Sequence, residues 1–123
     1  MNRRRIVIKI YDGKIKSGKT TRMLKDFAKY SNSLFVIGEE TPAALLKKCR
    51  DNNLINANIM TNKVLFKSDF GINDLTNILK VQKEFKNIFI DVPKFLLDNS
   101  STILEQLECE YDVKLYMSSY NRH

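Results

Sequence analysis

The chain has 123 residues, of which 43% are hydrophobic and 10% aromatic, and its net charge is +7. This composition is typical of globular proteins and excludes a chain that is disordered throughout. The length suits one domain, so we predict a single domain over residues 1–123. No apolar run approaches the roughly 20 residues of a membrane span, and the apolar stretch near the start is too short for a signal peptide. We therefore expect no membrane association and a cytoplasmic location.

The positive charge is concentrated in the first part of the chain. Residues 1–50 hold 13 Lys and Arg against four Asp and Glu, which leaves eight and ten for residues 51–123 and sums to +7. This asymmetry suits a polyanionic partner, either nucleotide phosphates or a nucleic-acid backbone, although lysines that only solvate helix surfaces explain many single positions. Cys49 and Cys109 lack metal-ligand spacing and His123 is the only histidine, so we expect reduced structural thiols.

Short β-branched and apolar segments alternate along the chain with segments of helical periodicity. In chain order we predict a strand at 6–11, a helix at 20–30, a strand at 34–37, a helix that begins at Thr41-Pro42, a strand within 59–66, a helix from Asn73 or Asp74, a strand at 88–91, a helix from Ser100 or Ser101 and a strand at 113–117. Strands that alternate with helices indicate a parallel sheet. The expected fold class is α/β, with a mostly parallel five-stranded sheet between two layers of helices.

The segment GKIKSGKTT follows the first predicted strand directly. It reads G-x-x-x-x-G-K-T, the pattern of a phosphate-binding loop, and a helix is expected to begin at its end. The glycines let the backbone turn tightly, so that successive N–H groups point at phosphate oxygens, and the helix adds the positive end of its dipole. The nucleotide-binding residues that we predict are Gly13, Lys14, Ile15, Lys16, Ser17, Gly18, Lys19, Thr20 and Thr21.

Lys19 and Thr20 carry the chemistry of this loop. The Lys19 amine is placed to neutralise the β- and γ-phosphates of a nucleoside triphosphate, and the Thr20 hydroxyl to ligate Mg²⁺. Thr21 is better explained as a residue of the first helical turn, and Lys14 and Lys16 as solvent-facing positions. The predicted cofactors are ATP, or another nucleoside triphosphate, and Mg²⁺. A glycine turn flanked by solvated lysines is the alternative.

Carboxylates are expected near the loop because a parallel sheet binds its ligands at the carboxyl ends of its strands. Asp91 ends the apolar run NIFID and is the candidate for holding Mg²⁺ through water, with a turn residue ahead of Pro93 as the alternative. Glu39 follows the second predicted strand and is the candidate catalytic base. Glu40 is better suited to the first turn of the following helix, where negative charge is favoured.

The order of these pieces resembles the ATPase core of RecA-like proteins, most closely the DnaB-type replicative helicases and their RadA-like relatives. The resemblance rests on the phosphate loop followed by SLFVIGEET, NIFIDVPKFL and VKLYMSSYNR, and it spans nearly the whole chain. It implies that Glu39 is a catalytic glutamate, that Asp91 is the magnesium-associated aspartate and that Ser119 lies in a polar sensor segment. It also implies the strand order 3-2-4-5-1, with the first strand at a free edge.

Two departures from the family pattern bear on the expected activity. The family usually has a glutamine where this chain has Ser119, which weakens the expected coupling between the γ-phosphate and DNA. The family's DNA-contacting loops and its arginine finger would follow the point at which this sequence ends, and such a finger contributes about 10³–10⁵ in rate. Arg122 is better explained as a frayed terminal residue than as a substitute finger. The resemblance therefore implies a slow ATPase at best.

Arg3, Arg4, Arg5 and Lys9 lie on or beside the predicted edge strand. Their charge either discourages edge-to-edge pairing or binds a nucleic-acid backbone, and the sequence does not separate these roles. The leading hypothesis is an ATP- and Mg²⁺-binding protein with weak or partner-dependent ATPase activity in DNA replication or recombination. The expected partners are DNA, more so single-stranded DNA, a replication or recombination protein, and a second copy of the chain. A phage or mobile element is a candidate source.

Two other functions stay open on the sequence alone. One is a non-catalytic RecA-like module that binds DNA or docks on a helicase, which the missing finger and Ser119 favour. The other, less favoured, is a small nucleoside or nucleotide kinase, because SGKTT also opens such enzymes. The acidic, Arg-poor second half of the sequence offers no obvious lid for a kinase.

Overall fold

The structure is a computed structural model that describes residues 8–13, 18–54 and 62–120. Its strands are β1 (Lys9–Gly13), β2 (Ser33–Ile37), β3 (Lys63–Phe66), β4 (Asn87–Asp91) and β5 (Lys114–Tyr120). Its helices are α1 (Lys19–Lys29), α2 (Pro42–Asp51), α3 (Ile72–Val81), α4 (Phe95–Asp98) and α5 (Ser101–Tyr111). The alternation of strands and helices is as predicted, and the short helix α4 is an addition.

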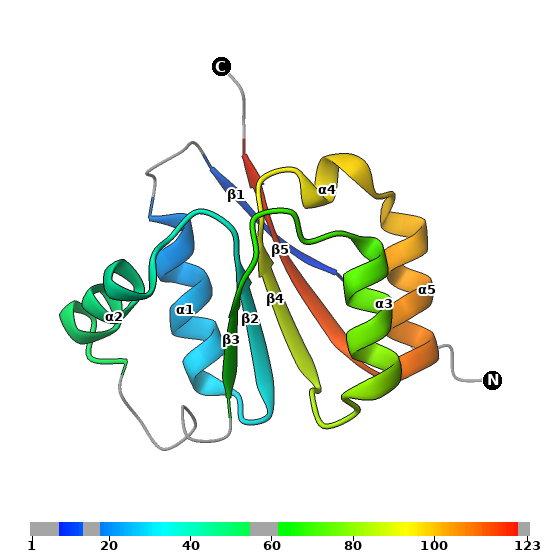
Figure 1. Cartoon of the computed structure of the whole chain (residues 1–123), viewed down its shortest axis with the longest axis horizontal. Coiled ribbons are helices and arrows are strands. Elements are labelled where there is room, and N and C mark those ends of the chain that lie inside the picture. The colour runs from blue at the N-terminus through cyan, green and yellow to red at the C-terminus, as the bar shows by residue number, and fades with distance from the viewer. Residues whose placement is uncertain (1–7, 14–17, 55–61, 121–123) are drawn as a thin grey trace.

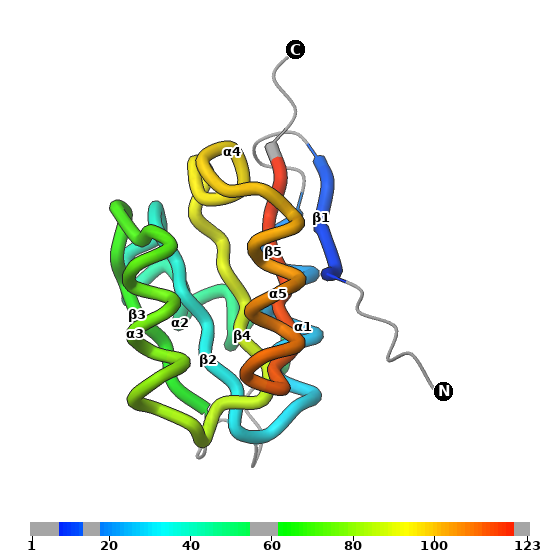
Figure 2. Tube along the Cα trace, turned by 90° about the vertical axis from the view of Figure 1, so that its right-hand side faces the viewer, coloured from blue at the N-terminus to red at the C-terminus, as the bar shows by residue number. Residues whose placement is uncertain are grey.

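The described strands form one sheet in the order β1-β5-β4-β2-β3, and every neighbouring pair is parallel. This is the predicted order read from the opposite edge, and it confirms the α/β class with a parallel sheet. β1 and β3 are the two edge strands (Figure 2). Because all five strands point the same way, their carboxyl ends share one side of the molecule, which we call the carboxyl edge (Figure 1). Their starts form the opposite, amino-terminal edge.

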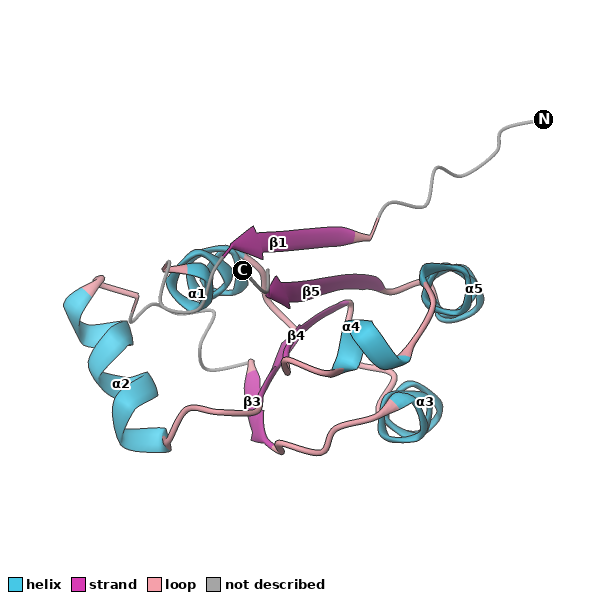
Figure 3. Cartoon of the chain, turned by 90° about the horizontal axis from the view of Figure 1, so that it is seen from above, coloured by secondary structure: helices cyan, strands magenta, loops and turns pink. Residues whose placement is uncertain are grey.

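Helices cover both faces of the sheet, with α1 and α2 on one face and α3, α4 and α5 on the other (Figure 3). Successive side chains of a strand point to opposite faces, so a strand covered on both faces must be apolar throughout. This explains the runs SLFVI in β2 and NIFID in β4, of which all residues but Asn87 are buried. The two strands therefore form the centre of the core.

Aromatic rings fill the core on the α1 side of the sheet. The Phe89 ring stacks on the Tyr116 ring with centroids 4.1 Å apart and on the Phe35 ring with centroids 6.0 Å apart. Phe27 of α1 meets Phe35 and Phe89 edge-on, at 5.3 and 5.8 Å. Both arrangements are favoured by the quadrupoles of the rings. On the other face, the core consists mainly of aliphatic side chains, among them Val36, Ile90 and Leu115.

The helix starts follow from local hydrogen bonds. The hydroxyls of Thr41 and Ser100 accept N–H groups of the first turns of α2 and α5, as N-cap residues do. The start of α3 differs from the prediction: the helix begins at Ile72, because the Asp74 carboxylate accepts the Gly71 N–H at 2.9 Å and so caps an earlier turn. None of the helices that the structure describes has the length and apolar character needed to cross a membrane.

Two predicted strands extend into residues that the structure does not describe. The first, at 6–11, is described from Ile8 onward, and β1 continues to Gly13. The third, within 59–66, is described from Asn62 onward and matches β3. The last strand reaches Tyr120 and is longer than the predicted segment 113–117, so that Ser119 belongs to β5.

We predict that Phe89→Ala lowers the free energy of unfolding by about 3–5 kcal/mol, because the change removes a ring that stacks on two rings and meets a third edge-on, and leaves a cavity. Urea denaturation followed by circular dichroism measures this. Val81→Ala is the matched control, since the Val81 side chain is 80% exposed, and we expect a change within about 0.5 kcal/mol. Equal effects of the two substitutions would contradict the described core.

Candidate functional site

The predicted phosphate loop joins β1 to α1 at the carboxyl edge. Gly13 ends β1 and Gly18 precedes α1, whereas Lys14, Ile15, Lys16 and Ser17 lie outside the described residues. Gly18 has φ 82° and ψ 13°, a left-handed conformation that strains any residue with a Cβ atom. Its carbonyl accepts the Arg22 N–H at 3.0 Å, the first bond of the helix. This turn makes Lys19 the first helical residue.

The Lys19 side chain lies buried at the carboxyl edge, with only 3% of its surface exposed. Its Nζ donates to the Gly13 carbonyl at 2.9 Å and to the Ser119 carbonyl at 2.5 Å. These oxygens belong to the neighbouring strands β1 and β5. Burial lowers the pKa of Lys19, and the negative charges of Asp91 and Asp12 oppose this effect.

Thr20 and Asp91 meet directly. The Thr20 hydroxyl donates to the Asp91 carboxylate with 2.6 Å between Oγ1 and Oδ2, and the contact joins the first turn of α1 to the end of β4. Asp91 is 3% exposed, and its carbonyl accepts the Gly38 N–H at 3.0 Å, which ties the end of β4 to that of β2. The two residues that the sequence assigned to one ion are thus brought together.

The site offers few protein ligands for a metal. Within the described ranges, no group of three or more His, Cys, Asp and Glu side chains could hold a metal ion, unlike the closed ligand sets of structural zinc. Mg²⁺ bound to nucleotide phosphates needs only one or two protein ligands, because phosphate oxygens and water complete its octahedron. A hydroxyl and a carboxylate oxygen 2.6 Å apart fit that ion.

The two predicted glutamates differ in their surroundings. Glu39 follows β2 at the carboxyl edge, is exposed, and makes no hydrogen bond or ion pair with the part of the chain that the structure describes. Glu40 was expected in the first turn of α2, but it precedes the N-cap Thr41 and forms an ion pair with Lys48 instead. Its carboxylate is therefore paired with a lysine side chain of the second turn of α2.

Ser119 and Thr21 complete the set of predicted residues. Ser119 reaches the site with its main-chain carbonyl, which accepts from Lys19. No signal in the sequence indicates such a contact, because every residue type has that carbonyl. Thr21 is a half-buried residue of α1, as predicted. The predicted nucleic-acid residues Arg3, Arg4 and Arg5 lie outside the described residues.

Asp26 of α1 anchors β1, the strand that leads into the predicted phosphate loop. Its Oδ2 accepts the Tyr11 hydroxyl at 2.5 Å and the Lys9 Nζ at 3.0 Å, and its Oδ1 accepts the Lys29 Nζ at 3.4 Å. Lys9, which the sequence left open as a residue that protects the edge or binds nucleic acid, thus has a carboxylate partner in the structure. Because β1 has only one strand neighbour among the described strands, these bonds to α1 add to a weakly supported edge.

A second contact fixes the end of β1. Arg22 donates from its guanidinium to the Asp12 carbonyl at 2.9 Å, one residue before Gly13. Arg22 and Asp26 were not predicted as contributors to the site. Their contacts are tertiary, and the spacing along the chain leaves no pattern by which to find them.

Comparison with protein-family models, with curated proteins and with solved structures found no significant match. The RecA-like resemblance of the motifs therefore stays a prediction. The contacts of Lys19, Thr20 and Asp91 remain as the physical basis for a function.

We predict that Asp26→Asn lowers the free energy of unfolding at pH 7 and that its difference from wild type shrinks in acid. Burial raises the pKa of Asp26, but hydrogen bonds from Tyr11 and Lys9 outweigh it, so the pKa lies below its ordinary value. A carboxyl with a lowered folded-state pKa adds stability above its unfolded pKa of about 3.9, and this stability is lost as the pH falls through the folded pKa.

Urea denaturation between pH 7 and pH 3 measures this difference. Glu105→Gln is the control, because Glu105 is exposed and has no hydrogen-bond or ion-pair partner within the described ranges, and we expect a small difference that does not change with pH. A pH-independent effect of Asp26→Asn would show that its charge does not stabilise the fold.

Proposed function

We propose that the chain binds a nucleoside triphosphate together with Mg²⁺ at the carboxyl edge of the sheet, where β1, α1 and β4 meet. One arrangement carries the proposal: Lys19, at the end of a phosphate-loop pattern, is buried beside the Gly13 carbonyl, and its neighbour Thr20 contacts Asp91 at 2.6 Å. A lysine amine, a hydroxyl and a strand-end carboxylate are the groups that phosphate-loop proteins use to bind the phosphates and their metal ion.

Each residue has a defined part in this proposal. Lys19 exchanges its two carbonyl partners for phosphate oxygens, which favours the charged amine despite its burial. The first N–H groups of α1 lack partners within the helix and donate to the same phosphates. Thr20 and Asp91 hold Mg²⁺, the hydroxyl directly and the carboxylate through water. The bound ion would neutralise charge on the phosphate oxygens.

Glu39 is the residue that decides between turnover and binding alone. It stands at the same edge as Asp91, two residues after the end of the adjacent strand β2, and is an exposed residue. As general base it would take a proton from the water that attacks the γ-phosphate. We propose slow or partner-dependent ATP hydrolysis on this basis. Because Glu39 has no partner in the described part of the chain to orient it, a module that binds ATP without turnover is the second candidate.

A wider part of the proposal concerns the cellular process. The motif order and the position of β5 between β1 and β4 support a RecA-like protein of DNA replication or recombination. This part rests on resemblance, and the nucleotide site does not depend on it.

We expect Lys19→Ala to weaken binding of MgATP at least about tenfold, because it removes a charge-assisted hydrogen bond to phosphate. Isothermal titration calorimetry measures the affinity, and a thermal melt verifies that the variant folds. Lys25→Ala is the matched control, since Lys25 is an exposed residue of the same helix with no described partner. Removal of Mg²⁺ with EDTA should weaken binding by wild type. Wild-type protein that does not bind MgATP would refute the proposal.

Glu39→Gln separates the two candidate functions. If Glu39 is the base, the variant keeps its affinity for MgATP and loses about 10²–10⁴ in the rate of hydrolysis. Release of inorganic phosphate, measured with a coupled assay, gives the rate. The control is Glu40→Gln, whose side chain is paired with Lys48 and should leave the rate unchanged. Binding without turnover in wild type, or an unchanged rate in Glu39→Gln, would support the non-catalytic module.

A further inference from the structure

A group of basic and aromatic side chains lies at the amino-terminal edge, where β1, β4 and β5 begin. It consists of Lys9, Lys29, Tyr30, Lys86 and Lys114, and we call it the basic patch. All five residues are exposed. We propose that the basic patch binds single-stranded nucleic acid, with phosphates on Lys86 and Lys114 and a base on Tyr30.

The contacts of Tyr116 bring one half of the basic patch together. Lys9 lies opposite Tyr116 in the register of β1 and β5. The Tyr30 ring, at the end of α1, stacks on the Tyr116 ring with centroids 6.2 Å apart. The Tyr116 hydroxyl donates to the Asn87 Oδ1 at 2.8 Å, which reaches the start of β4.

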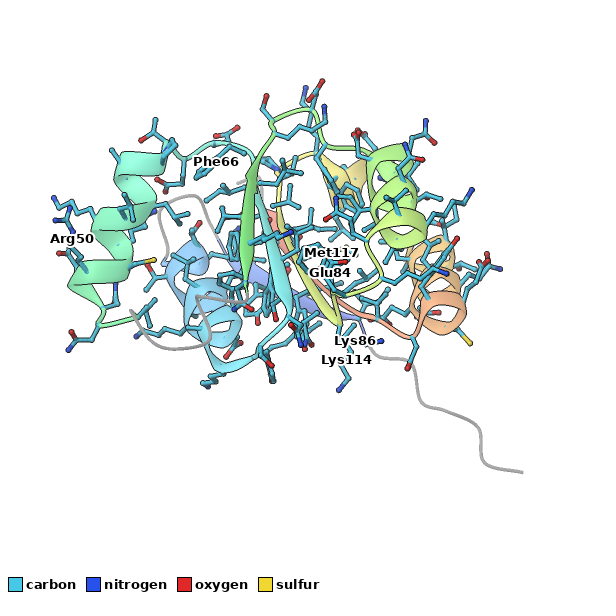
Figure 4. All side chains as sticks on the ribbon, turned by 60° about the horizontal axis from the view of Figure 1, so that its bottom comes forward. Arg50, Phe66, Glu84, Lys86, Lys114 and Met117 are labelled. Atoms are coloured by element: carbon cyan, nitrogen blue, oxygen red, sulfur yellow. The ribbon has the colours of Figure 1, made fainter. Side chains whose placement is uncertain are left out.

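Main-chain contacts join the other half of the basic patch to Asn87. Asn87 lies opposite Lys114 in the register of β4 and β5. The Lys114 N–H donates to the Lys86 carbonyl at 2.9 Å, and the Lys86 N–H donates to the Asn32 carbonyl at 2.9 Å. Figure 4 shows Lys86 and Lys114 beside the starts of these strands, toward the bottom of the view. The basic patch is therefore continuous from β1 to the loop before β4.

The lysines at the edges of the sheet differ in whether a carboxylate pairs with them. At the carboxyl edge, Lys48 is paired with Glu40 and Lys67 with Asp69. Lys86 and Lys114 make no ion pair with any residue in the described part of the chain. Exposed cations without carboxylate partners are the groups that displace counterions from a phosphate backbone.

Carboxylates also lie near the basic patch: Asp112 precedes Lys114 by two residues, and the Glu108 carboxylate accepts the Leu115 N–H at 2.6 Å. Lys9 and Lys29 share the carboxylate of Asp26, and Glu84, in the loop before β4, is within 3.7 Å of Lys63. The sequence adds Arg3, Arg4 and Arg5 shortly before Lys9, although their placement is not described. Lys86 and Lys114 are therefore the lysines of the basic patch that pair with no carboxylate in the described part of the chain.

Tyr30 supplies the contact that selects single strands. Its side chain is 42% exposed, and its ring is supported from behind by Tyr116. A ring that is already held in place can stack on an unpaired base at a low entropic cost. Bases in a duplex are stacked on each other and are not free to do so. Positive charge beside an exposed aromatic ring is the common plan of proteins that bind single strands without sequence preference.

The basic patch is distinct from the nucleotide site. The four steps from Lys9 to Gly13 along β1 place its two ends roughly 13 Å apart at about 3.3 Å per step, and the two sites share no residue. The inference deepens the proposed function by naming how its nucleic-acid partner is held. It can nevertheless stand or fail without the nucleotide site.

The test measures fluorescence anisotropy of labelled 20-residue oligothymidine and oligouridine with the full chain. We expect Lys86→Glu/Lys114→Glu to weaken binding at least about tenfold and to make the plot of log K against log salt shallower by about 1.4, or 0.7 for each of two lost phosphate contacts. Lys47→Glu/Lys94→Glu is the matched control, with the same charge change at exposed lysines that have no described partner. The control should lose less than threefold.

Tyr30 provides a second variant that does not change the charge. Tyr30→Ala should weaken binding of the single strands about five- to hundredfold and leave any residual binding of a duplex unchanged, whereas Tyr30→Phe should bind as wild type does. Thermal melts verify folding. Binding of either oligonucleotide that depends on these residues supports the proposal, and comparing the two distinguishes DNA from RNA.

Three results would overturn the proposal: equal losses in the two double variants, tighter binding of duplex than of single strands, or binding of phosphatidylserine vesicles in place of oligonucleotides. Two measurements distinguish failure of one site from failure of the other. In calorimetry with MgATP, Lys86→Glu/Lys114→Glu should retain nucleotide affinity, and in the anisotropy assay Lys19→Ala should retain oligonucleotide affinity. Oligonucleotide binding by a chain that fails to bind MgATP would refute the nucleotide site alone.

Discussion

The hydrogen bond between Thr20 and Asp91 is the contact on which the candidate site depends. It can form only if the end of β4 and the start of α1 reach the same point, although 71 residues separate the two side chains. The parallel sheet meets this requirement, because it turns every strand end toward the carboxyl edge and places β5 between β1 and β4. The aromatic stack beneath α1 then fixes the distance between helix and sheet. A change in the order of the strands would separate the two oxygens even if the motif itself were unaltered.

Much of this arrangement could be predicted from the sequence. The parts that could not be predicted share one cause. The β-branched runs, the N-caps Thr41 and Ser100 and the phosphate-loop pattern are local signals, and the strands and helices that they predict are confirmed. The helix α3 begins earlier than predicted because the Asp74 side chain caps the preceding turn. The helix α4 was not predicted because its four residues are too few to show a helical period. In the candidate site, Lys19, Thr20 and Asp91 could be selected from the sequence because residue type carries their chemistry, and the structure brings Thr20 and Asp91 into contact. The Ser119 carbonyl and the Asp26 carboxylate act through tertiary contacts that no spacing encodes.

The positive charge of Lys9, at the edge of the sheet, has a structural role in the contacts of β1. The sequence left open whether Lys9 protects the edge or binds nucleic acid, and the structure shows a third use, an ion pair to α1. That pair is largely exposed, with 55% of the Lys9 side chain accessible, so its own contribution to stability is about 0–1 kcal/mol. Tyr11, a buried residue of β1, donates its hydroxyl to the same carboxylate. Lys9 therefore supports the anchor of β1 while its exposed portion stays available at the amino-terminal edge.

One strand runs between the two proposed sites. β5 begins at Lys114 in the basic patch, passes Tyr116, whose ring stacks on that of Tyr30, and ends at Tyr120, one residue after the Ser119 carbonyl that accepts from Lys19. Because β1 and β4 bond it on both sides, β5 cannot shift without moving its neighbours, and packed cores resist such motion. Shared location on a strand is therefore no argument for coupling between sites. Coupling would require β5 to have two stable arrangements. In the proposal, nucleotide binding replaces one bond at the end of β5, the hydrogen bond from Lys19 to the Ser119 carbonyl. The two sites are thus best treated as energetically separate, which is why each can be tested without the other.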